Sequence, residues 1–206
     1  MAIKKEFRMS MPPDSVEAIP VRRREQAEWR RERILDAALL VFGNKGVDAA
    51  SMKEIAAAVG VAPSLLYHYF TSKEMLSEAV FVERGFLPEL RDLLAGAGQR
   101  PVTVVLTEVT AGLDRLLSRR TALVGLFVSG AANTQIRQGF EGVMSEGHRL
   151  LGDYLSQRVA AGEIRPHDTR TVVQALFSSC VLGHLIGQPV DSDALVRMVL
   201  EGIMVR

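Results

Sequence analysis

The sequence predicts an all-α fold. From about residue 28 onward, apolar residues recur with the three- and four-residue spacing of helices that bury one face. Ser/Thr-x-x-Glu sequences mark helix starts, and single glycines mark helix ends. Aromatic residues make up only 6% of the chain, and no convincing segment shows the two-residue alternation of a strand. Helices are therefore expected to provide all of the regular structure.

The composition bounds the class of protein. With 206 residues, 48% of them hydrophobic, the chain has ample material for one or two buried cores. The single cysteine, Cys180, cannot form an intrachain disulfide, which is typical of the reducing cytoplasm. No stretch reaches the roughly 18 apolar residues of a membrane span, and Met1–Pro20 lacks the apolar run of a secretory signal. We expect a cytoplasmic protein without a membrane partner.

Residues 1–27 are predicted to form a flexible basic arm, because prolines interrupt a segment without periodicity. Between Val21 and Arg33, arginines outnumber glutamates by six to three, although the whole chain has a formal net charge of only +1. Such a cluster can bind nucleic-acid phosphates; a solvated arm is the alternative. The hypothesis for Arg22, Arg23 and Arg24 is entry into a minor groove of DNA.

The first predicted helix begins near Glu28 and buries one apolar face. It ends at Asn44-Lys45-Gly46, where Gly46 suits the left-handed position after a helix. Ser51 and Glu54 form a predicted capping box that opens a short second helix, and Gly60 ends it.

A third helix is expected from Pro63, whose fixed φ suits a first helical turn, to about Tyr69. Two short helices joined by a glycine turn form a helix-turn-helix, here residues 51–70. The second helix of such a motif lies in the major groove of DNA.

A second Ser/Thr-x-x-Glu sequence, Thr71 to Glu74, is predicted to open one longer helix through about Ala95. Beyond Ala95, glycines, Pro101 and short polar segments separate the predicted helices. We expect residues 28–88 to form the DNA-binding domain and residues 89–206 a C-terminal helical domain. The remaining predicted helices cover residues 102–119, 121–132, 134–161, 168–187 and 192–205.

The run Arg33–Ala38, then Phe42, Gly46 and Ser51 through Phe70, resembles the TetR family of transcriptional regulators. The segment from Gly60 to Phe70, followed by Ser72-Lys73-Glu74, is similar to that family's signature. The resemblance in residue identity covers about residues 28–88; beyond them only the plan of helices is similar. The resemblance implies a homodimer that binds double-stranded operator DNA. It also implies repression of transcription, which is the more common activity in this family.

The resemblance also implies roles for individual residues. Base contacts would come from Ser64 and Leu65 in the third helix, the leucine through apolar contact with a thymine methyl. Phosphate contacts would come from the ends and exposed faces of the helices. The residues predicted to face DNA are Ser51, Lys53, Pro63, Ser64, Leu65, Tyr67, His68 and Lys73.

The sequence departs from the family pattern at Ala62 and Pro63. Family members usually carry a hydroxyl residue at Ala62, which caps the recognition helix, and often a lysine at Pro63. The missing cap should cost about 1 kcal/mol. We therefore expect phosphate positioning, DNA shape and the basic arm to contribute strongly to specificity.

The last two predicted helices are apolar around most of their circumference, which requires burial on more than one side. The resemblance implies that they join their mates in a four-helix bundle; a monomer with a larger core is the alternative. The predicted interface residues are Val173, Leu176, Cys180, Leu195, Val199 and Ile203.

A small hydrophobic or amphipathic effector among the central helices is the further implication of the resemblance. Taken singly, each candidate is more often plain core than pocket lining, and the histidines could orient a polar group. The candidate pocket residues are Phe86, Leu106, Leu113, Phe127, Phe140, Met144, His148, Phe177 and His184.

An enzyme and a helical interaction module are the two alternatives to a regulator. An enzyme is disfavoured because the four histidines lack metal-ligand spacing, and neither a phosphate-binding glycine loop nor a nucleophile elbow is present. No cofactor and no metal are expected. A helical interaction module with a degenerate helix-turn-helix remains open, because the recognition helix is poor in polar groups.

Overall fold

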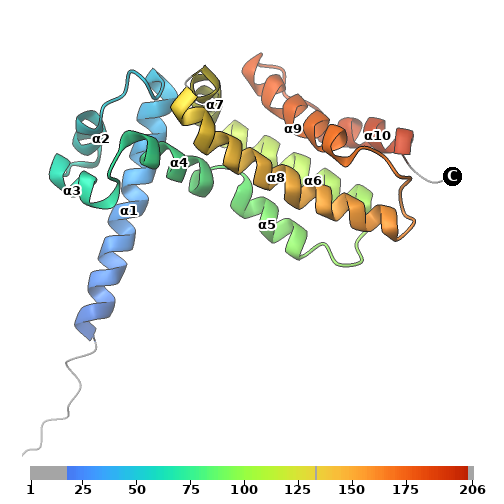
Figure 1. The fold of residues 1–206 in the computed structure, drawn as a ribbon, viewed down its shortest axis with the longest axis horizontal. Helices are drawn as coiled ribbons and strands as arrows, with labels where there is room; N and C mark the ends of the chain where they lie inside the picture. The colour runs from blue at the N-terminus through green and yellow to red at the C-terminus, as the bar shows by residue number, and fades with distance from the viewer. Residues whose placement is uncertain (1–17, 133, 204–206) are drawn as a thin grey trace, which may run out of the picture.

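The computed structural model describes residues 18–132 and 134–203, and in these ranges all regular elements are helices (Figure 1). This confirms the predicted all-α fold. The helices are α1 (Ala18–Lys45), α2 (Met52–Val59), α3 (Pro63–Tyr69), α4 (Lys73–Arg84), α5 (Leu87–Ala95), α6 (Val102–Arg119), α7 (Thr121–Ala132), α8 (Thr134–Ala160), α9 (Thr169–Leu185) and α10 (Ser192–Ile203). No helix among the described residues has the length and apolar character needed to cross a bilayer.

Helices α1 to α4 form one end of the molecule, which we call the head, and α5 to α10 form the body (Figure 1). The head has its own buried residues, including Leu35, Phe42, Ile55 and Leu66, each with no exposed surface. In the body, α6 packs against both α9 and α10, and α8 packs against α5 and α9. The two parts meet where α1 packs against α7 and where α4 packs against α8 and α5.

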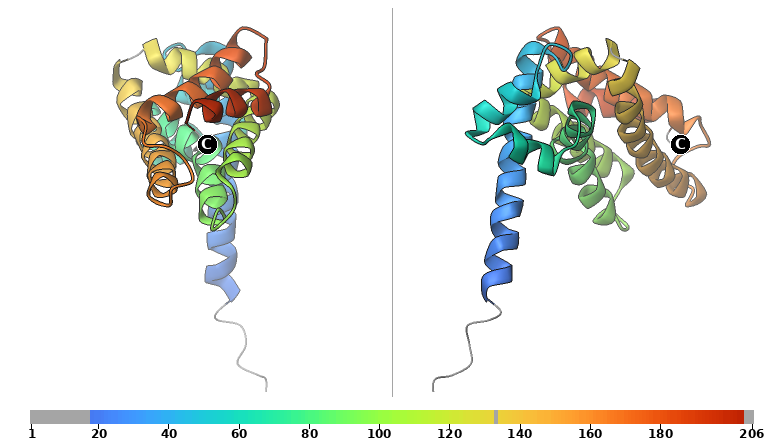
Figure 2. Two further views of the ribbon diagram at one scale, coloured as in Figure 1. Left: turned by 90° about the vertical axis from the view of Figure 1, so that its right-hand side faces the viewer. Right: turned by 60° about the vertical axis from the view of Figure 1, so that its left-hand side comes forward.

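The flexible arm predicted for residues 1–27 is wrong from Ala18 onward, because α1 already begins there. Arg, Glu, Gln and Ala all favour helices, and Pro20 falls in the first turn, where its missing N–H removes no helical hydrogen bond. Both views in Figure 2 show the N-terminal part of α1 projecting beyond every other helix. The prediction for residues 1–17 lies outside the described residues.

The two short helices form by the local signals that the sequence contains. The Ser51 side chain accepts from the Glu54 N–H at 3.2 Å, and the Glu54 carboxylate accepts from the Ser51 N–H at 3.0 Å, which completes the capping box. Gly60 closes α2 with a φ of 79°, a conformation that favours glycine. Pro63 opens α3, and its N-cap Ala62 makes no side-chain hydrogen bond, as expected.

The single helix predicted from Thr71 to Ala95 is wrong, because it is split into α4 and α5 at Gly85 and Phe86. Pro88 supplies the reason: in a continuous helix its ring would clash with the carbonyl of Arg84, and it has no N–H to donate. The start was also assigned one residue early, since Ser72 rather than Thr71 accepts from the Met75 N–H, at 3.2 Å.

Candidate nucleic-acid interface and ligand cavity

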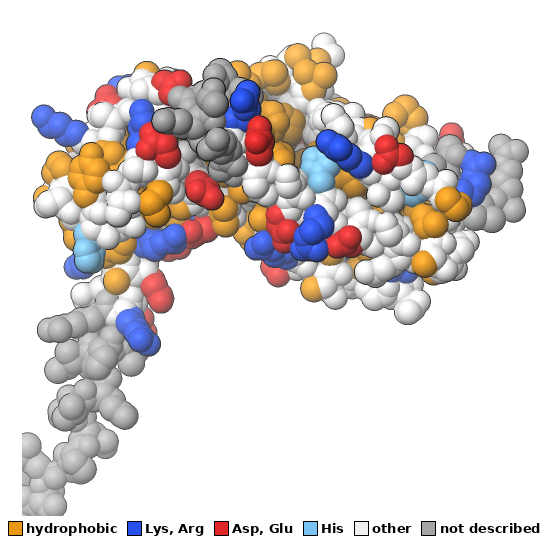
Figure 3. All heavy atoms as spheres, in the orientation of Figure 1, with side chains coloured by type: hydrophobic (Ala, Val, Ile, Leu, Met, Phe, Trp, Pro, Cys, Tyr) orange, Lys and Arg blue, Asp and Glu red, His pale blue; other side chains and the backbone are white. Residues whose placement is uncertain are grey.

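Helix α3 separates its residues sharply into a buried and an exposed face. Leu66 is fully buried in the head, whereas Ser64 and His68 are exposed and Tyr67 retains 49% of its surface. Leu65 is half-buried, which leaves part of its side chain for apolar contact. Basic, histidine and hydrophobic side chains share the surface at this end of the molecule (Figure 3). The face can therefore offer hydroxyl, imidazole and apolar groups to a partner.

The start of α2 places Ser51 and Lys53 on the surface, but Ser51 is already engaged. Its hydroxyl lies 3.1 Å from a Glu54 carboxylate oxygen, in addition to capping the helix. The Lys45 ammonium, 2.5 Å from Glu54, and the bonds from Ser51 hold the pKa of that carboxyl below its usual value. A phosphate at this helix start would meet an ionised glutamate, so Lys53 carries the favourable charge.

Lys73 at the start of α4 has a structural role that the sequence did not indicate. Its ammonium donates to the carbonyls of Asp48 and Ala50, both at 3.1 Å, and so ties α4 to the segment before α2. An ammonium has three N–H donors, so a third remains for a phosphate oxygen. The same side chain can thus fix the head and meet DNA.

Several arginines near the head are held by carboxylates. Arg31 pairs with Glu83 of α4, which lowers the pKa of the Glu83 carboxyl, and its guanidinium lies 5.4 Å from the ring centre of Phe70. The largely buried Arg84 contacts Glu32 at 2.5 Å and Asp36 at 2.7 Å, which locks the end of α4 onto α1. The pair with Glu83 gives Arg31, one member of the basic cluster, a structural role.

Arg24 is exposed on the projecting part of α1; the side chains of Arg22 and Arg23 lie outside the described residues. The hypothesis that this segment enters a minor groove does not fit a helix. An α-helix with its side chains is about 10–12 Å wide, and the minor groove of B-DNA is about 6 Å wide. As a helix, the segment can contact phosphates along the groove walls.

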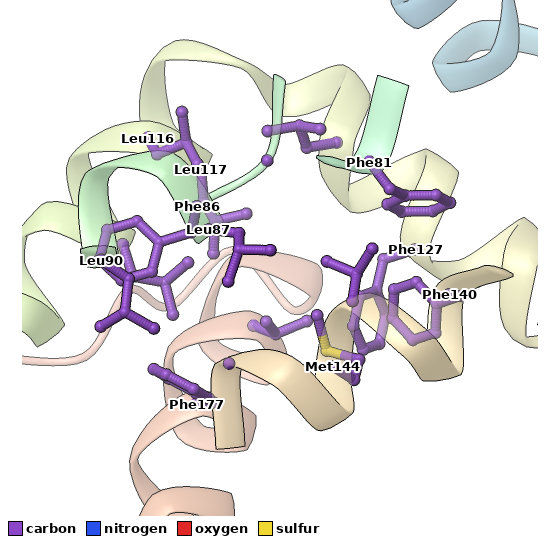
Figure 4. A pocket seen from close by; sticks show the side chains of 16 residues that line it. Phe81, Phe86, Leu87, Leu90, Leu116, Leu117, Phe127, Phe140, Met144 and Phe177 are labelled. Atoms are coloured by element: carbon purple, nitrogen blue, oxygen red, sulfur yellow. The ribbon is translucent and has the colours of Figure 1, made fainter. Parts of the chain in front are cut away.

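A partly open apolar cavity of about 90 Å³ lies between α4 of the head and α5, α6, α7, α8 and α9 of the body (Figure 4). Phe127 and Phe140 meet edge-to-face with ring centres 4.6 Å apart, and Phe86 meets Phe177 in the same way at 6.4 Å. The lining residues are Phe81, Gly85, Phe86, Leu87, Leu90, Leu113, Leu116, Leu117, Leu123, Phe127, Phe140, Val143, Met144, Gly147, Phe177 and Val181.

The predicted pocket residues divide into three groups. Phe86, Leu113, Phe127, Phe140, Met144 and Phe177 all line the cavity. His148 lines an adjoining groove instead, and its Nδ1 lies 2.7 Å from the Met144 carbonyl. Leu106 and His184 line neither the cavity nor the groove, so their assignment to these two sites is wrong. Leu106 is fully buried in the core, and His184 Nε2 lies 2.9 Å from an Asp114 oxygen. Phe81, Leu123 and Val143 were missed, because apolar periodicity does not distinguish a cavity wall from a filled core.

The predicted dimer residues mostly face inward. Val173, Leu176, Cys180 and Leu195 are buried within the protomer, so their assignment to a partner surface is wrong. Burial also raises the pKa of the Cys180 thiol to about 11. Val199 is half-buried against the same core, and the side chain of Ile203 lies outside the described residues.

The opposite face of α9 and α10 carries the exposed apolar groups. Leu182 is 55% exposed, Leu185 51%, Ile186 59% and Met198 66%. Hydrophobic side chains gather over the C-terminal end of α9 in Figure 3. We call these four residues the apolar face. Both faces of α9 are apolar at helical spacing, and only the packed structure distinguishes the inner from the outer one.

The sequence and the fold are similar to those of known bacterial regulators. The family described as bacterial regulatory proteins, tetR family, matches residues 34–80. The HTH-type transcriptional regulator UidR of Escherichia coli is 26% identical over 178 residues, which cover 84% of this chain and 87% of UidR. The HTH-type transcriptional regulator BetI of Rhizobium meliloti is 37% identical over 111 residues, which cover 52% of this chain and 54% of BetI.

Among solved structures, the transcriptional regulator FadR from Bacillus subtilis in complex with stearoyl-CoA is similar, with a TM-score of 0.67 and 25% identity. The match covers 82% of this chain and 95% of FadR. These relatives are regulators, which confirms the prediction of a regulator rather than an enzyme. The matched head, its helix-turn-helix and the shared helical plan agree: residues 34–80 match the TetR family, and the chain is similar over most of its length to DNA-binding transcriptional regulators of this kind.

Proposed function

We propose that the protein binds a palindromic operator as a homodimer, represses transcription from it, and releases it when an apolar or amphipathic effector enters the body. The observation that carries the DNA part is the exposed face of α3, supported from behind by the fully buried Leu66. A dimer on an operator also places the protein in the cytoplasm, on the nucleoid.

The DNA contacts follow from exposure and charge. Ser64 and Leu65 read base edges, and Pro63 at the helix start lies against the same groove. Tyr67 and His68 bind phosphates from the exposed side of α3, while Lys53 and Lys73 bind phosphates from the starts of α2 and α4. The contribution of Ser51 is smaller, because its hydroxyl already serves the capping box. Arg22, Arg23 and Arg24 add phosphate contacts along the projecting helix.

The apolar face supports dimerisation. Exposed apolar side chains on adjacent helices resemble half of a buried four-helix interface. Pairing two such faces makes an isologous contact, in which both protomers use the same surface. A dimer can then present its two α3 helices about 34–36 Å apart, one helical repeat of DNA, or at a multiple of that distance.

The link from cavity to head runs through α7. This helix gives Leu123 and Phe127 to the cavity wall. On its other side it packs Ala122 and Gly125 against Gly43 of α1; a Cβ on Gly43 would lie 2.4 Å from that of Ala122. Because nothing larger than glycine fits there, a displacement of α7 by an effector is passed to α1.

A second link runs through α4. Phe81 and Gly85 line the cavity, and Arg84 between them is bound to Glu32 and Asp36 of α1. An effector that favours a wider cavity therefore biases the orientation of the head, and lowers operator affinity by its differential affinity for the two states. The stearoyl-CoA bound to FadR supports a small-molecule effector for this fold.

Selection from fragmented genomic DNA tests the proposal. The purified protein should enrich a few fragments that share an inverted repeat, at moderate salt. The Tyr67→Ala variant should enrich them weakly while remaining folded, because Tyr67 is 49% exposed. A protein that enriches nothing would instead be an interaction module with a degenerate helix-turn-helix. That candidate is favoured by the few polar groups of α3 and by its missing side-chain cap.

A further inference from the structure

The apolar cavity continues into a second hollow. A groove of about 800 Å³ lies beside it between α8 and α9. Five residues line both hollows, so the two are separated only by side chains: Phe127, Phe140, Met144, Phe177 and Val181. A ligand that moves one of these side chains can occupy both.

The two hollows differ in chemistry. Only apolar side chains and glycines line the cavity, and such cavities stay dry and bind apolar groups. Its volume of about 90 Å³ is smaller than the roughly 150 Å³ of a cavity known to hold benzene. The end of an unbranched hydrocarbon chain fits better than a ring system.

The groove has an apolar part beside the cavity and a part lined by polar and charged side chains. Glu141 pairs with Arg137, and Arg149 pairs with Asp153. Among the described residues, by contrast, Arg170 has no carboxylate within salt-bridge distance, although it lines the groove. The charge of Arg170 does act on Asp168, whose carboxylate accepts from the Arg170 N–H and from Thr171. An anionic group can therefore bind the Arg170 guanidinium without breaking an ion pair at contact distance.

Helix α9 connects this cation to the cavity. Arg170, Gln174, Ser178 and Val181 follow one another at helical spacing and all line the groove, and Val181 also lines the cavity. The rise along the helix from Arg170 to Val181 is about 16 Å. A fully extended chain of single bonds advances roughly 1.2 Å per bond, so about a dozen carbons span this distance.

We propose that the effector is a long, unbranched amphiphile with an anionic head: its chain end occupies the apolar cavity, and its head binds Arg170 in the groove. This rests on the proposed function only for the consequence of binding, namely operator release. A carboxylate and the phosphates of an acyl thioester of coenzyme A share the required negative charge, so the test must separate these two sources.

Calorimetry with the full chain tests binding directly, using palmitoyl-CoA, palmitate and hexadecyltrimethylammonium, each below its micelle concentration. At least one of the two anions should bind, and the better one identifies the head. The cationic amphiphile should bind at least tenfold more weakly. In a series of shorter chains, affinity should rise by about fourfold per methylene, because each buried CH₂ contributes about 0.8 kcal/mol. Equal binding of the cation, or affinity independent of chain length, would overturn the proposal.

Two variants locate the ligand. Arg170→Gln should weaken binding of the better anion about tenfold, whereas Arg119→Gln, an exposed arginine on α6, should change nothing. Val181→Phe, which narrows the passage, should weaken long chains more than short ones. Unchanged binding in both Arg170→Gln and Val181→Phe contradicts the site.

Operator release is measured separately, by fluorescence anisotropy of labelled operator. If an anion binds but the operator is retained, the proposed function fails and the ligand site stands. If neither anion binds while operator binding is intact, the ligand assignment fails and the DNA-binding function stands.

Discussion

The head and the body are stabilised in different ways, and their sites differ accordingly. In the head, short-range devices set the shape of the DNA surface: the Ser51–Glu54 capping box, the left-handed Gly60 and the first-turn Pro63. In the body, long helices pack around a hollow that no single segment encodes. The head therefore presents an exposed surface set by local signals, and the body a hollow set by the packing of several helices. Their coupling depends on the contacts of α1 with α7 and of α4 with α5 and α8.

The largest expected effect comes from the apolar face of the body. Leu182→Asp places a charge in the proposed interface, so the dimer should dissociate and operator affinity should fall on the order of 10³-fold. Sedimentation velocity and fluorescence anisotropy measure the two effects. Leu40→Asp is the matched control, because Leu40 is 59% exposed on α1 and Leu182 55% exposed on α9. A Leu182→Asp protein that remains dimeric would contradict the proposed role of the apolar face as the dimer interface.

The second largest effect is expected from a substitution at the junction between head and body. Gly43→Ala forces a Cβ against Ala122, and overpacking of this kind costs about 1–3 kcal/mol of unfolding free energy. Gly142→Ala in α8 is the control: its Cβ meets nothing within 4 Å, and the higher helix propensity of alanine should stabilise by about 0.5–1 kcal/mol. Urea unfolding measures both. Equal effects of the two substitutions would mean that the α1–α7 contact is not tightly packed.

An N-cap hydroxyl added to the recognition helix α3 should stabilise the head. Ala62 already has the extended backbone of an N-cap, with φ of −67° and ψ of 143°. Ala62→Ser should therefore raise the unfolding free energy by about 1 kcal/mol, whereas Ala57→Ser inside α2 should lower it slightly. Thermal unfolding of the two variants decides the point. A loss of stability in Ala62→Ser would show that the hydroxyl does not reach the α3 amides.

The smallest expected effect concerns the ion pair between α1 and α4. The Arg31 guanidinium lowers the pKa of Glu83 below 4.5 in the folded protein. The stabilisation that this ion pair gives the folded protein is therefore fully present above pH 4.5. It is lost as the pH falls through the pKa of Glu83 in the folded state. Glu83→Gln should lose about 0.5 kcal/mol near pH 7, the scale of a partly exposed pair, and less at pH 3. Unfolding at both pH values measures this. A constant difference between wild type and variant would contradict the linkage.

Sequence reasoning succeeded where one segment contained its own signal. The capping box, Gly60, Pro63 and the uncapped Ala62 are all local, and the structure confirms each of them. The break before Pro88 was also local but was overlooked, so one predicted helix is two.

Non-local features could not be predicted in the same way. The apolar pattern of α9 does not say which face turns inward, so Val173 and Leu176 were assigned to the partner although they are buried in the protomer. The cavity arises from the packing of several helices. Arg170 has no sequence signal, because it becomes notable only beside the groove.

The central claim is that two protomers place their α3 helices in successive major grooves. Hydroxyl-radical footprinting of a selected fragment tests it most directly. Two protected half-sites, centred about 10–10.5 base pairs or a multiple apart, are expected with the wild type, and no protection with Leu182→Asp at the same concentration. A single protected half-site with the wild type, or an unchanged footprint with the variant, would contradict the claim.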